Sequence, residues 1–168
     1  MFLNTFKLCL TVFFLSAVSY AQSVTFTLPD GWGKNEELSK QGEELVFTLI
    51  GEEKPKETLT ITVNDIKAGA DRILWNNFIN IKKKYSDFKY YKPLYTPKNS
   101  IGVGCSTEGS FCTVQRVEVY EGDIYVYSYI NTYPHYGQGL FGKWTNILGL
   151  IRAGEQEKTR ETDGVFEI

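Results

Sequence analysis

The sequence predicts an α+β fold in which an antiparallel β-sheet is covered by two main helices. Three observations predict it. Runs of alternating apolar and polar residues, typical of strands, come both before and after a segment with helical periodicity. A two-residue turn joins one pair of these runs, and antiparallel strands accept so short a connection. A second segment with helical spacing follows, without the regular alternation of strand and helix that builds a parallel sheet.

The first elements are three strands. Val24, Phe26 and Leu28 alternate with polar neighbours, and a turn with proline at its second position follows at residues 28–31. Residues 44–50, which are mostly apolar, form the second predicted strand. Residues 58–63 form the third, in which leucine, isoleucine and valine share one face.

A helix is expected next, over residues 70–85, where apolar side chains recur at helical spacing. The apolar stripe consists of Leu74, Phe78, Ile81 and Tyr85, widened by Trp75 and Ile79. The three lysines at 82–84 lie near its C-terminal end, where cations complement the helix dipole.

The second half of the chain begins with an irregular crossing marked by Pro93, Pro97, Gly102 and Gly104. Two strands, 113–120 and 123–130, then form a hairpin around Glu121 and Gly122. A closing helix carries apolar side chains at 140 or 141, 144, 147, 148 and 151, and Gly154 is placed to end it.

The N-terminus indicates export. Lys7 precedes an apolar run, 8–18, that is shorter than a bilayer span and is followed by Ser19-Tyr20-Ala21. We therefore expect residues 1–21 to be a signal peptide, residues 22–153 a single globular α+β domain, and residues 154–168 a polar, mobile tail. The expected location is periplasmic or secreted.

The composition excludes some partners. Without residues 1–21 the chain holds 17 basic and 20 acidic residues, a net charge of −3, which suits neither nucleic acid nor a polybasic membrane anchor. The mature chain contains no second apolar run of spanning length, so no transmembrane segment is expected there.

The mature chain has two cysteines, Cys105 and Cys112. In an exported protein they are expected to form a disulfide that closes a short loop, worth up to about 2.5 kcal/mol on the chain-entropy model. A redox pair usually has a closer spacing, and one histidine is too few for a typical zinc site, so no metal is expected. The Gly-x-Gly-x-x-Gly run at 137–142 lacks the following parallel strand of a dinucleotide site, and no cofactor is expected.

The unusual feature is a series of tyrosines. Because side chains alternate along a strand, Tyr125, Tyr127 and Tyr129 share one face. The candidate partner-binding residues are these three with Tyr133, His135 and Tyr136 in the following loop. Two interpretations are open, because the phenols either pack beneath a helix or form a recognition surface of the kind enriched in binding hot spots. No catalytic residue is identified, because His135 has no evident nucleophile or orienting carboxylate.

The segment Phe26-Thr27-Leu28-Pro29-Asp30-Gly31-Trp32, in which a strand runs into a Pro-x-Gly-Trp turn, resembles the opening of the PsbP-like proteins and bacterial DcrB. The order of elements is similar too. The resemblance implies an α/β/α sandwich on an antiparallel sheet, in a family whose members mostly act as non-catalytic accessory or binding proteins. No functional residue is carried over.

The expected function is therefore that of an exported, non-enzymatic accessory or binding protein. It would recognise another macromolecule of the cell envelope, most simply a protein, through the region from Tyr125 to Tyr136. Two alternatives stay open. One is a periplasmic inhibitor or immunity protein against a toxin or enzyme. The other is a small-molecule binder or enzyme with a tyrosine-lined pocket between sheet and helix.

Overall fold

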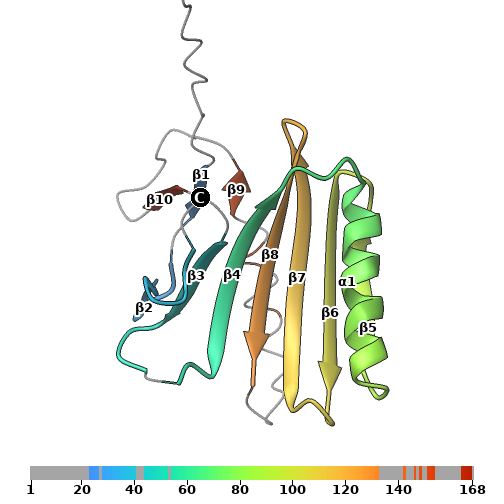
Figure 1. The fold of residues 1–168 in the computed structure, drawn as a ribbon, viewed down its shortest axis with the longest axis horizontal. Helices are drawn as coiled ribbons and strands as arrows, with labels where there is room; N and C mark the ends of the chain where they lie inside the picture. The colour runs from blue at the N-terminus through green and yellow to red at the C-terminus, as the bar shows by residue number, and fades with distance from the viewer. Residues whose placement is uncertain are drawn as a thin grey trace, which may run out of the picture.

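The computed structural model describes residues 23–26, 28–40, 44–52, 54–132, 142, 146, 148, 151–153 and 164–167. Their main feature is an antiparallel seven-stranded sheet in the order β2-β3-β4-β8-β7-β6-β5 (Figure 1). Its strands are β2 (Trp32–Lys34), β3 (Glu44–Leu49), β4 (Glu57–Asn64), β5 (Lys89–Tyr95), β6 (Asn99–Ser106), β7 (Phe111–Tyr120) and β8 (Asp123–Asn131). The helix α1 (Ala70–Lys84) connects β4 to β5.

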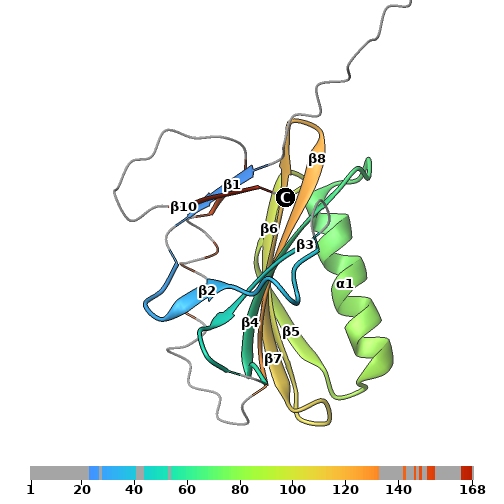
Figure 2. The same ribbon diagram turned by 60° about the vertical axis from the view of Figure 1, so that its left-hand side comes forward.

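A smaller sheet has the order β10-β1-β9. It consists of β1 (Ser23–Phe26), β9 (Arg152–Ala153) and β10 (Gly164–Glu167). Figure 2 shows α1 on one side of the large sheet and this small sheet on the other. Each face of the large sheet therefore has its own hydrophobic cluster, one around Phe78 of α1 and one around Tyr127 of β8.

The observed elements confirm an α+β fold built on an antiparallel sheet. The helix expected at 70–85 is α1, and the strands expected at 44–50, 58–63, 113–120 and 123–130 correspond to β3, β4, β7 and β8. Between β7 and β8, Glu121 and Gly122 both have positive φ, 51° and 96°. These angles are those of a type I′ turn, whose twist matches that of the paired strands.

The prediction that the stretch from Pro93 to Gly104 is irregular is wrong. This stretch belongs to two paired strands, β5 and β6. The glycines serve close packing there, because a Cβ on Gly102 would lie 2.5 Å from the Phe78 ring and one on Gly104 would overlap the Phe88 ring.

Two other expectations concern the C-terminal part. Among the described residues, α1 is the one helix with defined bounds, and most of the segment from 140 to 151, where a second was expected, lies outside them; residues 142, 146 and 148, which are described, have helical backbone. Two side chains from that segment, Leu148 and Ile151, are buried against the sheet face opposite α1. The expected tail at 154–168 contains β10, whose residues 164–167 pair with β1. This part of the stretch is a strand because Val165 and Phe166 continue an extended, paired backbone.

Cys105 and Cys112 face one another across β6 and β7, in register, with their sulfur atoms at bonding distance. The disulfide therefore clips the β6–β7 hairpin, as expected from the spacing. The proposed signal peptide, residues 1–21, lies outside the described residues.

Candidate functional site

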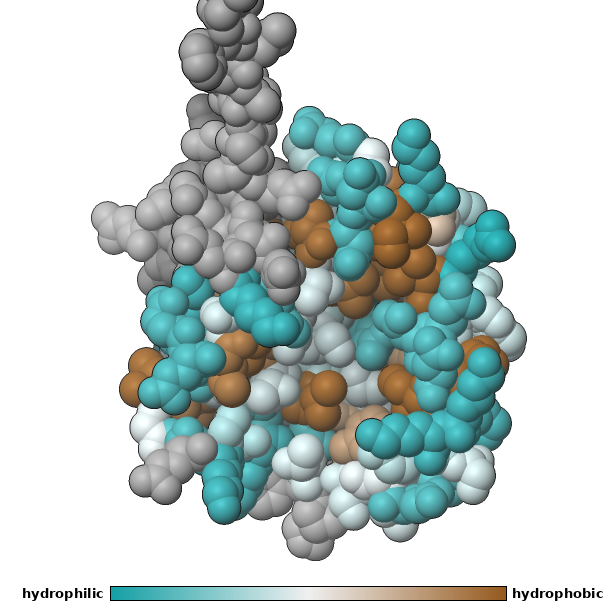
Figure 3. All heavy atoms as spheres, in the orientation of Figure 1, coloured by the Kyte–Doolittle hydropathy of each residue, from teal (hydrophilic) through white to brown (hydrophobic). Residues whose placement is uncertain are grey.

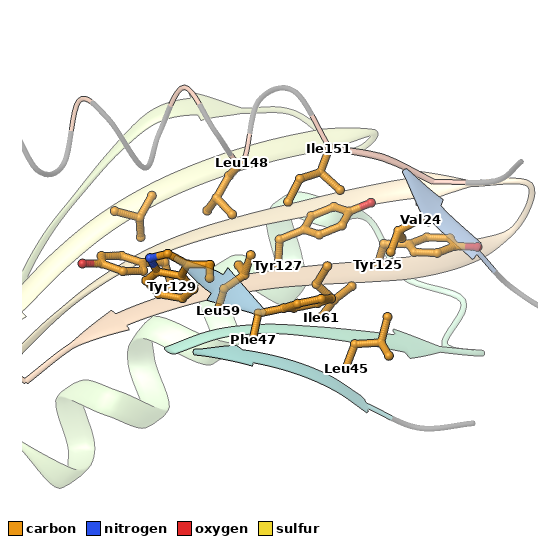
Figure 4. Packing of buried hydrophobic residues seen from close by; sticks show 12 residues of the cluster. Val24, Leu45, Phe47, Leu59, Ile61, Tyr125, Tyr127, Tyr129, Leu148 and Ile151 are labelled. Carbon is orange, nitrogen blue, oxygen red and sulfur yellow. The ribbon is translucent and has the colours of Figure 1, made fainter. Parts of the chain in front are cut away.

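The tyrosines of β8 lie in the core. Tyr125 is 3% exposed, and Tyr127 and Tyr129 are fully buried. Figure 4 shows their rings among buried aliphatic side chains, with Leu148 and Ile151 above them. Of the two interpretations of the tyrosine face, the structure supports packing, and these three side chains are not available for direct contact with a partner.

Burial also sets the chemistry of these phenols. It raises the pKa of Tyr125 to about 12, with a smaller contribution from the charge of Asp123. Burial likewise raises the pKa of Tyr127, whose hydroxyl donates a hydrogen bond to Glu118 Oε2 at 3.2 Å. Both tyrosines are therefore neutral at physiological pH, and neither has the lowered pKa of an activated acid or nucleophile.

The remaining candidate residues, Tyr133, His135 and Tyr136, lie outside the described residues. Their role in partner binding stays a prediction.

A buried arginine beside the tyrosines was not singled out from the sequence. Arg116 donates to Asn99 Oδ1 at 3.1 Å and to the carbonyl oxygens of Leu148 and Ile151 at 2.8 and 2.7 Å. Its Nη2 lies 3.0 Å from Glu118 Oε1. Arg116 thus links the sheet to the segment that covers the tyrosines, which is a structural role.

Exposed aromatic side chains gather instead on α1 and β5. Four of the seven large hydrophobic side chains that are exposed among the described residues lie there. We call this set, with the neighbouring Tyr90 and Lys92, the α1–β5 surface; its exposed members are Trp75, Tyr91, Leu94 and Tyr95. Trp75 is 40% exposed, Tyr91 68% and Tyr95 43%. Figure 3 shows brown and teal side chains next to one another over the right-hand part of the molecule, where Figure 1 places α1.

Lys92 organises the aromatic rings on the α1 side. Its ammonium lies 4.4 Å from the ring centre of Trp75 and 4.0 Å from that of Tyr95, which are cation–π distances. Tyr90 packs against Trp75 edge to face at 6.2 Å. The rings are therefore held in place before any partner arrives, which reduces the entropy lost on binding.

The fold fixes α1 against β5 at both ends of this surface. The Ala70 amide at the start of α1 donates to the Pro97 carbonyl at 2.8 Å, just beyond β5. Phe78 and Phe88 enclose the Tyr90 ring at centroid distances of 5.2 and 5.8 Å. Aromatic packing in this cluster thus holds the helix and the edge strand as one unit.

The same part of the chain concentrates positive charge. Residues 66–98 contain eight lysines and arginines against two acids, whereas the rest of the chain contains ten against eighteen. The corresponding net charges are +6 and −8. Seven of the eight cations are exposed, so the α1–β5 surface lies within a basic region of an acidic protein.

Two hollows flank this unit. One, of about 320 Å³, lies on β5 and β6 beside Tyr91 and Val103. The other, of about 510 Å³, lies between α1 and the sheet and combines apolar Ile81, Phe111 and Ile130 with polar groups that include Lys84. The second has the size of a small-molecule site and an amphipathic lining.

The described residues contain no group of three or more histidines, cysteines or acids that could hold a metal ion. In the same ranges, no helix has the length and apolar character needed to cross a membrane.

Sequence reasoning missed the α1–β5 surface for two reasons. Trp75 was placed on the buried stripe of the helix, but it lies at the stripe's margin and is partly exposed. Pro93 was taken as a sign of irregular structure at residues 89–95, although an edge strand tolerates proline. The signal that could have revealed the surface is the concentration of lysine and tyrosine at residues 89–95, together with the local excess of lysine.

Comparison with known proteins shows similarity at the level of fold. No protein-family model matches the sequence, and no curated protein does. The solution structure of cyanobacterial PsbP (CyanoP) from Synechocystis sp. PCC 6803 matches with a TM-score of 0.52 and 10% identity, covering 82% of this chain and 96% of that one. The crystal structure of the Saccharomyces cerevisiae Ran-binding protein Mog1p matches with a TM-score of 0.53 and 8% identity, covering 77% and 89%. The chain therefore has a PsbP-like fold.

Proposed function

We propose that this protein is an exported, non-catalytic binding protein that captures a protein partner at the α1–β5 surface. The observation that carries the proposal is the gathering of exposed aromatic rings and lysines on one pre-organised edge. Aromatic side chains with a polar group dominate the energy of many protein interfaces, and clusters of them are rare on surfaces without partners.

The fold comparisons agree with this proposal without establishing it. One similar structure is that of a Ran-binding protein, so a fold of this kind supports a protein interface in at least one case. The export part of the proposal depends on the sequence of residues 1–21 and is compatible with the Cys105–Cys112 disulfide.

A photo-crosslinking residue at position 91 tests the interface. Tyr91 is highly exposed, so the replacement leaves the fold intact. We expect one discrete cross-linked protein in the native host, lost when Trp75→Ala and Tyr95→Ala are added. The matched control carries the same residue at Ile50, which is at least as exposed as Tyr91, and captures nothing specific. Equal cross-linking from both positions would contradict the proposal.

Mass spectrometry of the protein from its native host tests export. The expected chain begins at Gln22 and carries Cys105 and Cys112 joined as a disulfide. An intact Met1 with two free thiols contradicts this part of the proposal while leaving the interface untouched.

The hollow between α1 and the sheet supports a second candidate, a binder of small amphipathic anions. Apolar Ile81, Phe111 and Ile130 would hold a chain, and Lys84 at the rim would hold a carboxylate. Titration with decanoate, followed by the NMR signals of the Ile81 and Ile130 methyl groups, tests it. Saturable shifts that disappear in Thr113→Phe, which fills the hollow, are the expected result.

A further inference from the structure

We propose that the partner supplies a short acidic strand that pairs with the free edge of β5 and extends the seven-stranded sheet. This inference rests on the proposed function, since it names the partner chemistry of the same surface. It is carried by the backbone geometry of β5, by the charge around it and by the side chains on either face.

The backbone of β5 has groups that face away from the sheet. The Val119 amide donates to the Lys98 carbonyl at 2.8 Å. With the observed register, the even-numbered residues of β6 therefore direct their N–H and C=O groups toward β7. The residues between them direct theirs at β5, where they oppose Lys89, Tyr91 and Leu94. Tyr90 lies between Lys89 and Tyr91, and Lys92 follows Tyr91 directly, so the N–H groups of Tyr90 and Lys92 point outward.

β5 is the last of the described strands on this side of the sheet. The pairing shifts between Tyr91 and Leu94, which places Lys92 and Pro93 opposite Gly102. Proline lacks an N–H, so the outer edge offers donors at Tyr90 and Lys92 and not at Pro93. The segment open to a new strand is therefore short, about four residues from Lys89 to Lys92.

Charge selects the class of partner. A second copy of this chain would bring two regions of net charge +6 together, which opposes pairing between copies through β5. An acidic segment would instead meet the exposed Lys89 and Lys98 and the half-buried Lys92.

The side chains of such a strand would have suitable neighbours on both faces. Side chains on one face of the added strand would meet the rings of Trp75 and Tyr95 and the ammonium of Lys92. Side chains on the other face would meet the hollow of about 320 Å³ beside Tyr91. An alternating peptide could thus place a carboxylate against lysine and an apolar side chain in the hollow.

Two capped seven-residue peptides test the proposal, one alternating glutamate and valine and the other lysine and valine. We expect the acidic peptide to bind the full-length protein and to slow hydrogen exchange of the Tyr90 and Lys92 amides at least tenfold, while the basic peptide does neither. Absence of protection, or equal binding of both peptides, would overturn the proposal.

A matched pair of variants isolates the backbone bond. Lys92→Ala removes the cation and keeps the N–H, whereas Lys92→Pro removes both without touching a bond to β6. We expect Lys92→Pro to bind the acidic peptide about fivefold more weakly than Lys92→Ala, the effect of one hydrogen bond. Equal affinities in two folded variants count against strand pairing, and the exchange measurement on the unaltered protein decides if Lys92→Pro fails to fold.

The experiments distinguish failure of the proposed binding function from failure of the proposed strand pairing. If the cross-linker at position 91 captures a partner but that partner leaves the Tyr90 and Lys92 amides unprotected, the binding function stands and strand addition is wrong. If sedimentation shows that β5 instead pairs two copies of this chain, the acidic strand is wrong. Failure of both cross-linking and peptide binding removes the interface itself.

Discussion

Buried residues differ in how much they stabilise the fold, and Arg116 contributes strongly. We expect Arg116→Met to destabilise the fold by about 3 kcal/mol, because it removes the cation beside Glu118 and the donor to the Leu148 carbonyl. Urea unfolding measures the change. The control is Lys34→Ala, which breaks an exposed ion pair with Glu36 and should cost less than about 0.5 kcal/mol.

The tyrosines also differ in how much they stabilise the fold, depending on whether they are buried or exposed. Tyr129 is fully buried, so we expect Tyr129→Ala to cost about 4 kcal/mol through the cavity it leaves. Tyr91 is exposed, and Tyr91→Ala should change the unfolding free energy by no more than about 0.5 kcal/mol. Thermal and urea unfolding compare the two variants. Similar losses of stability from both would contradict the assignment of Tyr91 to the surface.

At the scale of elements, Asp87 joins the segment after α1 to the β6–β7 turn. Its carboxylate accepts hydrogen bonds from the Ser106 hydroxyl at 2.6 Å and from the Thr107 and Glu108 amides at 2.7 and 3.0 Å. The hydrogen bond from Ser106, followed by that from Glu108, holds the pKa of Asp87 below its ordinary value of 3.8. The folded state therefore favours the ionised carboxylate.

This lowered pKa predicts the pH dependence of stability. A carboxyl whose pKa is lower in the folded state stabilises the protein at pH values above its unfolded pKa, and the contribution is lost as the pH falls through the folded value. The stability difference between the unaltered protein and Asp87→Asn should thus be constant from neutral pH down to about pH 5 and shrink below the ordinary value of 3.8. Urea unfolding across this range measures it. A difference that does not change with pH would contradict the role of the charge.

The sequence predicted the elements whose signals, periodicity and turn residues, lie within one short segment. The helix at 70–84 and the hairpin of β7 and β8 have clear periodicity and a turn of defined chemistry. The pairing of β5 with β6 was missed because Pro93 and two glycines suggest a loop. The glycines are explained only when the rings of Phe78 and Phe88 are seen above them. Tertiary packing here overrides local propensity.

The candidate site could be predicted only in part, for a related reason. Period-two alternation correctly placed the three tyrosines of β8 on one face. It could not decide whether that face is covered, because the cover comes from Val24, Leu148 and Ile151, far away in sequence. The edge position of β5, which exposes the alternative surface, follows from the order of strands in the whole sheet.

At the scale of the whole molecule, the separation of charge is the property that a partner would meet first. Residues 66–98 carry a net charge of +6 and the remaining residues −8, so the basic edge belongs to an otherwise acidic chain. The acidic partner proposed above would be attracted to the edge and repelled by the rest of the chain, which would orient the encounter before contact.

This arrangement predicts how binding responds to salt. The Debye length falls from about 10 Å at 0.1 M salt to about 3 Å at 1 M. The association rate of the acidic peptide should therefore decrease at least tenfold over this range, while its dissociation rate changes little. Stopped-flow fluorescence of Trp75, which lies beside Lys92, measures both rates. Lys89→Glu on the edge strand should slow association at low salt, whereas Lys54→Glu in the exposed loop between β3 and β4 should not. If the two variants slow association equally, attraction depends on total charge and not on the basic edge.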